Sequence, residues 1–245
     1  MLRVLTLLLA LSLTASAADL KVLMIGAIEP GFGRVAEQFK KEAGHNIATQ
    51  NDTAPGLIKR IASGETGDIL IAPDNVIDEA VKQGKAIAAT KTNVAKVGIG
   101  IALRRGATVP NVKTADALKQ ALLSADSIVY NEGSSGLYLE KLFEQMGIAA
   151  QLKTKTTRYP NGGQVIQHVI NGKGVEIGLV PVPVIISNEG KGIQLAGPLP
   201  AEVQNATSYA AVVMTSGKSI DAAKDFIRYL TLPAAKQTFK AAGVD

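Results

Sequence analysis

The chain of 245 residues has no cysteine and no tryptophan, and it contains only two histidines. Without cysteine, disulfide bonds, thiol nucleophiles, zinc ribbons and iron–sulfur clusters are all excluded. His45 and His168 are too few for a histidine-rich metal centre, and no motif supports a carboxylate site for a hard cation. We therefore expect neither a metal nor any other cofactor.

Aromatic residues make up only 4% of the chain, so we do not expect a carbohydrate site built on flat aromatic platforms. The net charge is +5, but the lysines and arginines form no dense stripe interleaved with aromatic residues, and we expect no binding to nucleic acid. The segment GFGR at 31–34 lacks the third glycine of a dinucleotide fingerprint, and no Ser–His–Asp motif is present. Hydrolase and dehydrogenase chemistry are therefore disfavoured.

The first seventeen residues have the features of a secretory signal peptide. A positive start at 1–3 precedes an apolar run at 4–14, and Ala15–Ala17 forms a small-residue cleavage site. We expect cleavage before Ala18, with an uncleaved membrane anchor as the alternative. No later segment reaches about 18 uninterrupted apolar residues, so we expect no stable membrane insertion of the mature chain. Export without cysteine fits a bacterial periplasm.

Apolar runs and amphipathic segments alternate along the mature chain. Leu20–Ala27 is a nearly continuous apolar run typical of a buried strand, and helical spacing follows from Pro30 up to Gly44. The expected strands and helices cover 20–27, 30–43, 45–50, 55–63, 68–72 and 74–83, and then 114–122, 127–130, 135–146, 152–158, 163–170 and 176–180. This order predicts an α/β protein with doubly wound, mostly parallel sheets.

Two extended segments, at 94–103 and 205–215, interrupt this alternation. They favour two α/β lobes joined as a clamp that closes on a ligand. A single doubly wound domain with one large sheet is the alternative. The predicted lobe 1 covers 18–95 with 212–245, and the predicted lobe 2 covers 96–211.

Four segments carry a resemblance to a known family: VLMIGAIEPGFGRVAEQFKKEAG at 22–44, DTAPGLIKRIASGETGDILIAPD at 52–74, YNEGSSGLYLEKLFEQMGI at 130–148 and NGKGVEIGLVP at 171–181. In their order they resemble the molybdate-binding family of periplasmic solute-binding proteins over nearly the whole mature chain. The resemblance implies the two-lobe, type 2 fold of that family and a permease of an ABC transporter as partner. We expect the protein to be a monomer.

Three places depart from the pattern of that family. There, serine hydroxyls in the first two strand–helix loops hold the oxyanion, and a tyrosine follows the last strand of lobe 2. The corresponding places in this chain carry Gly26-Ala27, Thr53 and Pro181. We therefore predict a small organic carboxylate as the ligand, with molybdate or tungstate as an alternative.

Helix N-termini present unpaired N–H groups and a partial positive charge, so several of them facing one cleft form an anion site. Loops at 28–31, 52–56 and 132–136 enter helices at the carboxyl ends of strands, where open α/β sheets bind ligands. Arg158 would add a forked contact to a carboxylate, unless it is a solvated surface residue. The candidate ligand-binding residues are Ala27, Ile28, Thr53, Ala54, Asn131, Ser134, Ser135, Gly136, Arg158, Tyr159, Gly163, Pro181 and Tyr209.

Enzymatic activity is an alternative to ligand binding for transport. Some proteins that resemble the same lineage are periplasmic isomerases acting on aconitate, a reaction that moves a proton and requires a base beside an anion clamp. Glu29, Glu132 and His168 are the candidate bases, although a histidine in the middle of a helix also fits a structural role. Carboxylates at Glu29, Asp52 and Glu132 near the expected cleft argue against a bare, highly charged anion.

Overall fold

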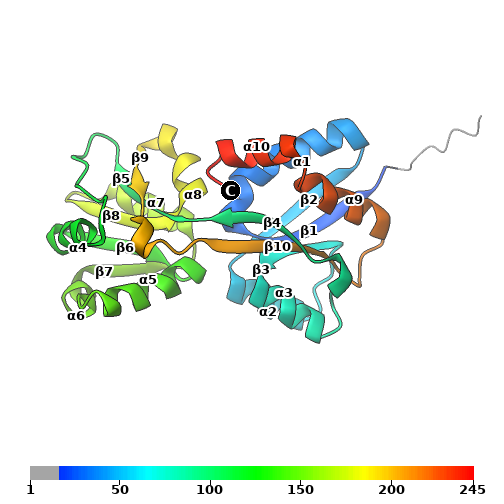
Figure 1. The fold of residues 1–245 in the computed structure, drawn as a ribbon, viewed down its shortest axis with the longest axis horizontal. Coiled ribbons are helices and arrows are strands. Elements are labelled where there is room, and N and C mark those ends of the chain that lie inside the picture. Colours follow the sequence, from blue (N-terminus) through cyan, green and yellow to red (C-terminus); the bar gives the residue numbers. More distant parts are fainter. Residues whose placement is uncertain (1–16) are drawn as a thin grey trace, which may run out of the picture.

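The computed structural model describes residues 17–245 and has two lobes, each built on a five-stranded sheet. In Figure 1 lobe 1 lies on the right and lobe 2 on the left, with helices on both faces of each sheet. The predicted signal peptide lies outside the described residues, apart from Ala17. Within 17–245 no helix is long and apolar enough to cross a membrane.

Lobe 1 has the strand order β2-β1-β3-β10-β4, in which β10 runs against the other four strands. Its strands are β1 (Asp19–Ile25), β2 (Asn46–Asp52), β3 (Ile69–Pro73), β4 (Thr92–Val97) and β10 (Thr207–Val213). Its helices are α1 (Glu29–Ala43), α2 (Ala54–Ala62), α3 (Asp74–Lys82), α9 (Ile220–Leu230) and α10 (Pro233–Ala241). Figure 1 shows α1, α9 and α10 on one face and α2 and α3 on the other.

Lobe 2 repeats this plan with the strand order β7-β6-β8-β5-β9, in which β5 runs against the rest. Its strands are β5 (Ile99–Arg104), β6 (Ser127–Asn131), β7 (Thr156–Tyr159), β8 (Glu176–Pro181) and β9 (Ile193–Pro198). Its helices are α4 (Ala115–Ser124), α5 (Ser134–Gln145), α6 (Ala149–Leu152), α7 (Gly162–Asn171) and α8 (Val182–Ile186). Both sheets are therefore mixed, with four of five strands pointing the same way, and the predicted two-lobe α/β fold is confirmed.

The local signals of α1 show how the sequence positions a helix beside the cavity described below. Pro30 lies in the first turn, where a missing N–H costs nothing, and Gly44 ends the helix with a φ of 74°. Phe32 and Phe39 lie on the buried face and pack against Phe226 of α9, with ring centroids 5.6 and 4.8 Å apart. This packing fixes the helix axis, so that the N-terminal turn stays at the carboxyl end of β1.

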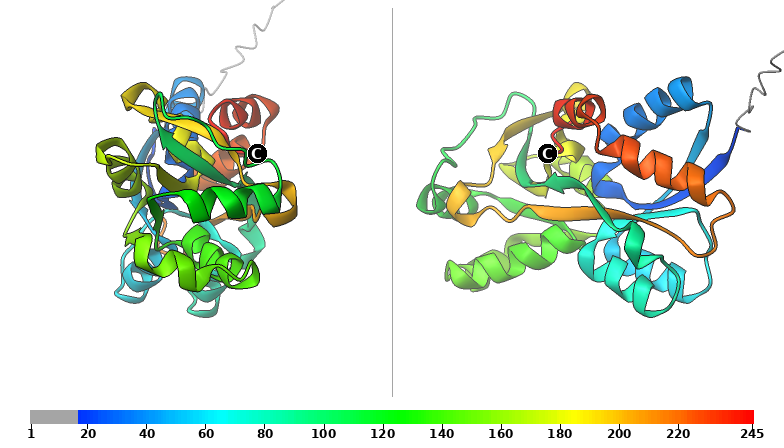
Figure 2. Two further views of the ribbon diagram at one scale, coloured as in Figure 1. Left: turned by 90° about the vertical axis from the view of Figure 1, so that its left-hand side faces the viewer. Right: turned by 45° about the vertical axis from the view of Figure 1, so that its right-hand side comes forward.

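The chain crosses between the lobes twice, at Gly98 and at residues 204–206. The extended segment expected at 94–103 is split by Gly98 into β4 of lobe 1 and β5 of lobe 2. The side chain of Gln204 joins the crossings: it accepts from the Ile99 N–H at 2.8 Å and donates to the Ile99 carbonyl at 3.0 Å. Figure 2 shows the two crossing strands running side by side. The predicted lobe boundaries at 95/96 and 211/212 fall inside β4 and β10, both strands of the lobe 1 sheet.

Candidate binding site

A cavity of about 530 Å³ lies between the lobes, and both lobes line it. It lies at the carboxyl ends of the parallel strands, where open α/β sheets commonly bind ligands. Its wall from lobe 1 consists of Ile25, Gly26, Ala27, Glu29, Pro30, Asn51, Asp52, Thr53, Ala54 and Tyr209. Its wall from lobe 2 consists of Asn131, Gly133, Ser134, Ser135, Pro160, Asn161, Gly162, Gly163, Pro181, Val184, Ser187 and Asn188.

Most candidate ligand-binding residues meet in this wall. They are Ala27, Thr53, Ala54, Asn131, Ser134, Ser135, Gly163, Pro181 and Tyr209. Of the three candidate bases, Glu29 lines the cavity, whereas Glu132 and His168 do not. Ile28 is fully buried in the core of lobe 1 instead.

In lobe 1, the N-terminus of α2 is already occupied by the protein's own groups. The Asp52 carboxylate accepts from the Thr53 N–H at 2.7 Å. The Thr53 hydroxyl accepts from the Gly56 N–H at 3.4 Å, and Pro55 has no N–H to offer. A side chain at Gly56 would collide with the Asp52 carboxylate, so Asp52 packs directly on the first turn. The two capping groups therefore take up N–H donors that an external anion would otherwise use.

Asp52 also belongs to a chain of charges behind α2. Its second carboxylate oxygen lies 3.7 Å from the Arg60 guanidinium, which bonds to Glu65 at 2.7 Å. Lys21 bonds to the same Glu65 at 2.9 Å. The hydrogen bonds from Arg60 and Lys21 lower the pKa of Glu65 to about 2. Arg60 thus partly compensates the charge of Asp52.

The second lobe 1 helix at the cavity, α1, also carries an acidic group. Glu29 is its first residue and is exposed at the cavity wall, and Pro30 follows it. A carboxylate in the first turn interacts favourably with the helix dipole. Both lobe 1 helices at the cavity therefore have an acidic residue of their own at or beside the N-terminus.

In lobe 2, the N-terminus of α5 differs: Glu132 precedes its N-cap just as Asp52 precedes that of α2, but the Glu132 side chain does not line the cavity. Its N-cap is Gly133, which makes no side-chain cap, and the first turn contains no acidic residue. Ser134 and Ser135 line the cavity there, and the Ser135 hydroxyl donates to the Asn131 amide oxygen at 3.0 Å. Gly136 is buried and does not line the cavity. A side chain at Gly136 would collide with the Asn131 carbonyl, so glycine allows α5 to lie close to β6.

The N-terminus of α7 is similar. The Asn161 side chain caps it by accepting from the Gln164 N–H at 3.1 Å, and Gly162 and Gly163 form the first turn at the cavity wall. No acidic residue lies in that turn. Glycine leaves these backbone N–H groups open, so the first turns of α5 and α7 offer donors for an anion at the cavity.

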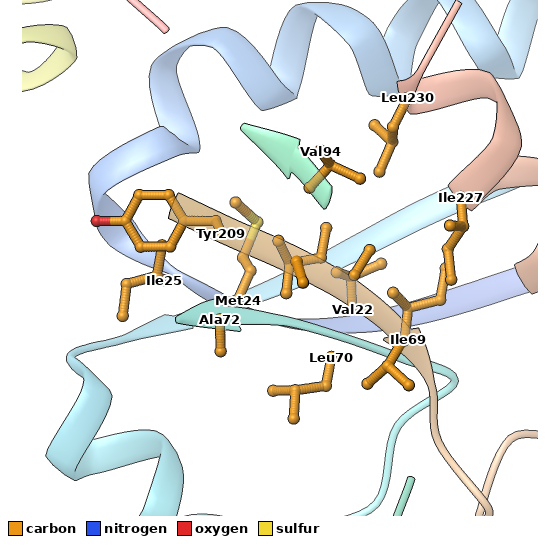
Figure 3. Close-up of a cluster of buried hydrophobic side chains, with 14 of the residues drawn as sticks. Val22, Met24, Ile25, Ile69, Leu70, Ala72, Val94, Tyr209, Ile227 and Leu230 are labelled. Carbon is orange, nitrogen blue, oxygen red and sulfur yellow. The ribbon is translucent and has the colours of Figure 1, made fainter. Parts of the chain in front are cut away.

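Two further polar groups complete the lobe 1 wall. The Asn51 amide oxygen is buried and has no hydrogen-bond partner in the described chain. Burial raises the pKa of Tyr209 to about 12, so its hydroxyl stays protonated and can donate at neutral pH. Figure 3 shows the Tyr209 ring beside Ile25, with the hydroxyl pointing away from the other labelled side chains.

Arg158 does not reach the cavity. It lies in β7, and its guanidinium pairs with Glu140 of α5 at 2.7 Å, on an exposed surface of lobe 2. Successive side chains of a strand point to opposite faces, so a position near the strand end does not decide which face an arginine takes. The expected forked contact from Arg158 to a ligand is therefore absent from this arrangement.

Tyr159 and His168 lie together on a flank of lobe 2. The Tyr159 hydroxyl is 2.9 Å from the His168 Nδ1, and the His168 Nε2 is 3.2 Å from both Glu176 and Ser127. His168 lies six residues after Gly162, or about 9 Å along the helix axis, which removes it from the cavity end of α7. These contacts support the structural role for His168.

Four asparagines line the cavity. The sequence selects Asn131 as a candidate ligand-binding residue, and Asn161 only as part of a segment, Asn161-Gly162-Gly163, with backbone donors. Asn51 is the penultimate residue of β2, Asn161 caps α7, and Asn188 follows α8. Asn131 and Asn51 are alike in position, since each is a polar residue at the carboxyl end of a strand before a helix. Asn188 had no comparable signal in the sequence.

The charges of the wall are unevenly distributed. Among the described residues that line the cavity, the charged ones are Glu29 and Asp52, and both belong to lobe 1. The described chain has no cluster of three or more metal-ligating side chains. The arrangement suits an anion held by backbone N–H groups and hydroxyls of lobe 2, facing acceptors of lobe 1.

Comparison with known proteins adds to this geometry. A family model described as bacterial extracellular solute-binding protein matches residues 20–245. An aconitate isomerase from a Pseudomonas species is 25% identical over 92% of this chain and 87% of its own length. The molybdate-binding protein ModA of Azotobacter vinelandii is 25% identical over 95% of this chain and 92% of its own. A solved structure of the periplasmic molybdate-binding protein of that organism superimposes with a TM-score of 0.77 at 19% identity, covering 92% of this chain and 98% of that one.

Proposed function

This chain belongs to the family of bacterial extracellular solute-binding proteins, and on that premise we propose that it captures a small organic carboxylate in the periplasm for an ABC transporter. It is a solute-binding protein of the ABC-transporter type. The cavity between the lobes is its ligand site. We further propose that residues 1–17 are removed before Ala18 on export and that the mature protein acts as a monomer.

The observation that carries this proposal is the convergence of α5 and α7 of lobe 2 on one cavity, with no acidic residue in either first turn. Each helix N-terminus stabilises a nearby anion by about 0.3–1 kcal/mol, and by up to about 2 kcal/mol where the site is partly buried. Hydroxyls of Ser134 and Ser135 add neutral donors to the same wall. A carboxylate can thus bind without a cationic side chain.

The size and charge of the cavity favour an organic anion over molybdate. A volume of about 530 Å³ is in the usual range for small-molecule sites and leaves much space around a single tetrahedral oxyanion. An oxyanion in contact with both lobes would also face Glu29 and Asp52. An organic acid avoids this repulsion, because it can direct its carboxylate to lobe 2 and its other groups to lobe 1.

Native mass spectrometry of protein purified without dialysis, followed by calorimetry, tests the proposal. We expect a co-purifying carboxylic acid, and binding of at least one member of a panel of di- and tricarboxylates with a Kd in the micromolar range or below. Molybdate and tungstate belong in the same panel. Tight binding of molybdate with no heat from any carboxylate would overturn the proposal.

A second candidate function is isomerisation of aconitate, which the similarity to an aconitate isomerase favours. Glu29 is the candidate base that lines the cavity, and it could take a proton from a carboxylate-bearing substrate held by lobe 2. Incubation of the protein with cis-aconitate in deuterium oxide separates the two functions. Enzymatic activity would appear in proton spectra as deuterium incorporation and trans-aconitate, and Glu29→Gln would abolish both. A pure binding protein would leave the spectrum unchanged.

A further inference from the structure

We infer that the ligand carries a hydroxyl group next to its carboxylate, and that this hydroxyl donates to the acceptors of lobe 1 around Asn51 and Asp52. The inference rests on the proposed function, because it assumes that the cavity holds an organic carboxylate. It adds the class of substrate, a hydroxycarboxylate, and the residues that select it.

The N-terminus of α2 is the first reason. Asp52 packs on the first turn and accepts from the Thr53 N–H at 2.7 Å, so a carboxylate of the protein itself already interacts with this helix N-terminus. Asp52 also lines the cavity, where it offers acceptor capacity. The Ala54 N–H is left over in this turn, but the Asp52 charge beside it disfavours a second carboxylate, so a ligand group that donates a hydrogen bond to Asp52 is favoured here.

The Asn51 amide oxygen is the second, independent reason. It is a buried acceptor without a partner in the described chain, although Asn51 lines the cavity. An unsatisfied buried polar atom in a native structure needs an explanation, such as a functional role or a bound water or ion. At the wall of a cavity, a donor on the ligand would supply the missing partner. The terminal torsion of asparagine is broad and soft, so the oxygen can turn to a donor that enters the cavity.

The charges around Asp52 favour a neutral donor over an ammonium group. Arg60 lies 3.7 Å from Asp52 and would repel a second cation beside it. Glu29 is exposed at the first turn of α1, where the helix dipole already stabilises its charge. A hydroxyl can satisfy the Asn51 and Asp52 oxygens without bringing a further positive charge to this wall.

Lobe 2 complements this requirement. Its part of the wall contains no acidic residue among those described, and it offers Ser134, Ser135 and the first turns of α5 and α7. A hydroxycarboxylate placed with its carboxylate toward lobe 2 and its hydroxyl toward lobe 1 would satisfy both walls in one orientation. The reverse orientation would place a carboxylate against Asp52.

Matched ligands test the inference by calorimetry on the full mature protein. Malate, succinate and aspartate share one skeleton and differ by a hydroxyl, a hydrogen and an ammonium at one carbon; citrate and tricarballylate form the same pair on a larger skeleton. We expect the hydroxylated member of at least one pair to bind at least about tenfold more tightly, since a site built to bond a hydroxyl rejects an analogue that lacks it. Aspartate should bind no better than succinate.

Two variants assign the preference to lobe 1. Asn51→Leu removes the unpartnered oxygen at similar volume, and it should bring the ratio of malate to succinate affinity close to one, with malate losing the larger factor. Ser134→Ala in lobe 2 is the matched control, which should weaken both ligands equally and leave the ratio unchanged. Asp52→Ala is a second lobe 1 variant, should Asn51→Leu lower the melting temperature; it removes both carboxylate oxygens and should likewise lower the ratio of malate to succinate affinity.

The outcomes distinguish a failure of the hydroxyl preference from a failure of the proposed carboxylate binding. Equal binding of malate and succinate, and of citrate and tricarballylate, would overturn the hydroxyl and leave the carboxylate site standing. Preference for aspartate would overturn it in favour of an ammonium donor. Binding of molybdate alone would overturn the proposed function itself.

Discussion

Lobe 1 and lobe 2 meet the cavity with the same construction, a parallel strand that ends there and a helix that begins there, but their helix N-termini carry different groups. In lobe 1 Asp52 and Glu29 lie at the starts of α2 and α1. In lobe 2 the corresponding turns of α5 and α7 contain serine and glycine. A shared fold thus sets where a ligand binds, whereas the few residues around each first turn set which chemical group the ligand presents to each lobe.

The largest effect should come from giving lobe 2 the charge that lobe 1 has. Ser134→Asp places a carboxylate at the start of α5, where it would repel the ligand carboxylate by several kcal/mol. We expect calorimetry to show a loss of affinity of at least about a hundredfold. The same substitution should slightly stabilise the ligand-free protein by interacting with the helix dipole.

Leu137→Asp is its control, since Leu137 is an exposed residue of the same helix. It adds the same charge three residues later on a solvent-exposed position and should leave the affinity within about threefold. If both variants lose binding equally, net charge and not the N-terminus of α5 is responsible.

A smaller effect of opposite sign should follow from removing the charge of lobe 1. Asp52→Ala frees the Thr53 N–H and the first turn of α2 to meet an anion. Succinate should then bind about three- to tenfold more tightly, which corresponds to the usual ~1 kcal/mol of a helix N-terminus. Glu37→Ala removes an equal charge from an exposed position of α1 and should change little. Unchanged succinate binding in Asp52→Ala would mean that α2 does not face the ligand.

The charge chain behind Asp52 predicts an acid sensitivity specific to lobe 1. Because Arg60 and Lys21 hold the folded pKa of Glu65 near 2, its ion pairs stabilise the fold above the unfolded pKa of about 4.3 and are lost as the pH falls toward 2. Glu65→Gln should therefore lower the free energy of unfolding at pH 7 and flatten its decline between about pH 4.5 and 2. Chemical unfolding at several pH values measures this, and identical pH profiles would contradict the pairing.

The smallest effect is expected at Arg158. Because its guanidinium pairs with Glu140 on an exposed surface, Arg158→Ala should change ligand affinity by less than about twofold and stability by less than about 1 kcal/mol. Calorimetry and thermal melting check both. A loss of affinity of tenfold or more would place the arginine in the ligand site after all.

Periodicity was sufficient to predict most of the fold. The apolar run of β1, the spacing of Phe32 and Phe39 on α1 and the stop at Gly44 are local features, and the structure has each of them. The boundary between the two strands in the extended stretch at 94–103 was harder to predict. Apolar residues continue to alternate through Gly98, although the chain passes there from one sheet to the other. Only tertiary pairing, including the Gln204 bridge, decides where one strand ends and the next begins.

The site was predictable where it depends on chain order and not where it depends on side-chain direction. The loops after β2 and β6 follow the carboxyl ends of parallel strands, which is the edge of the sheet where ligands bind. Thr53 and Ser134 of these loops line the cavity. Arg158 and Glu132 lie beside such loops yet point elsewhere, since a shift of one residue along an extended chain reverses the side-chain face. Asp52 can pack on the first turn of α2 only because Gly56 has no side chain. Composition alone does not reveal this contact.

The most direct test of the difference between the two walls is a crystal structure of the mature protein with the best-binding hydroxycarboxylate. We predict that the ligand carboxylate lies on the N–H groups at the starts of α5 and α7, and that the ligand hydroxyl lies within hydrogen-bond distance of Asn51 or Asp52. A ligand carboxylate seated on the first turn of α2, with Asp52 displaced, would contradict it.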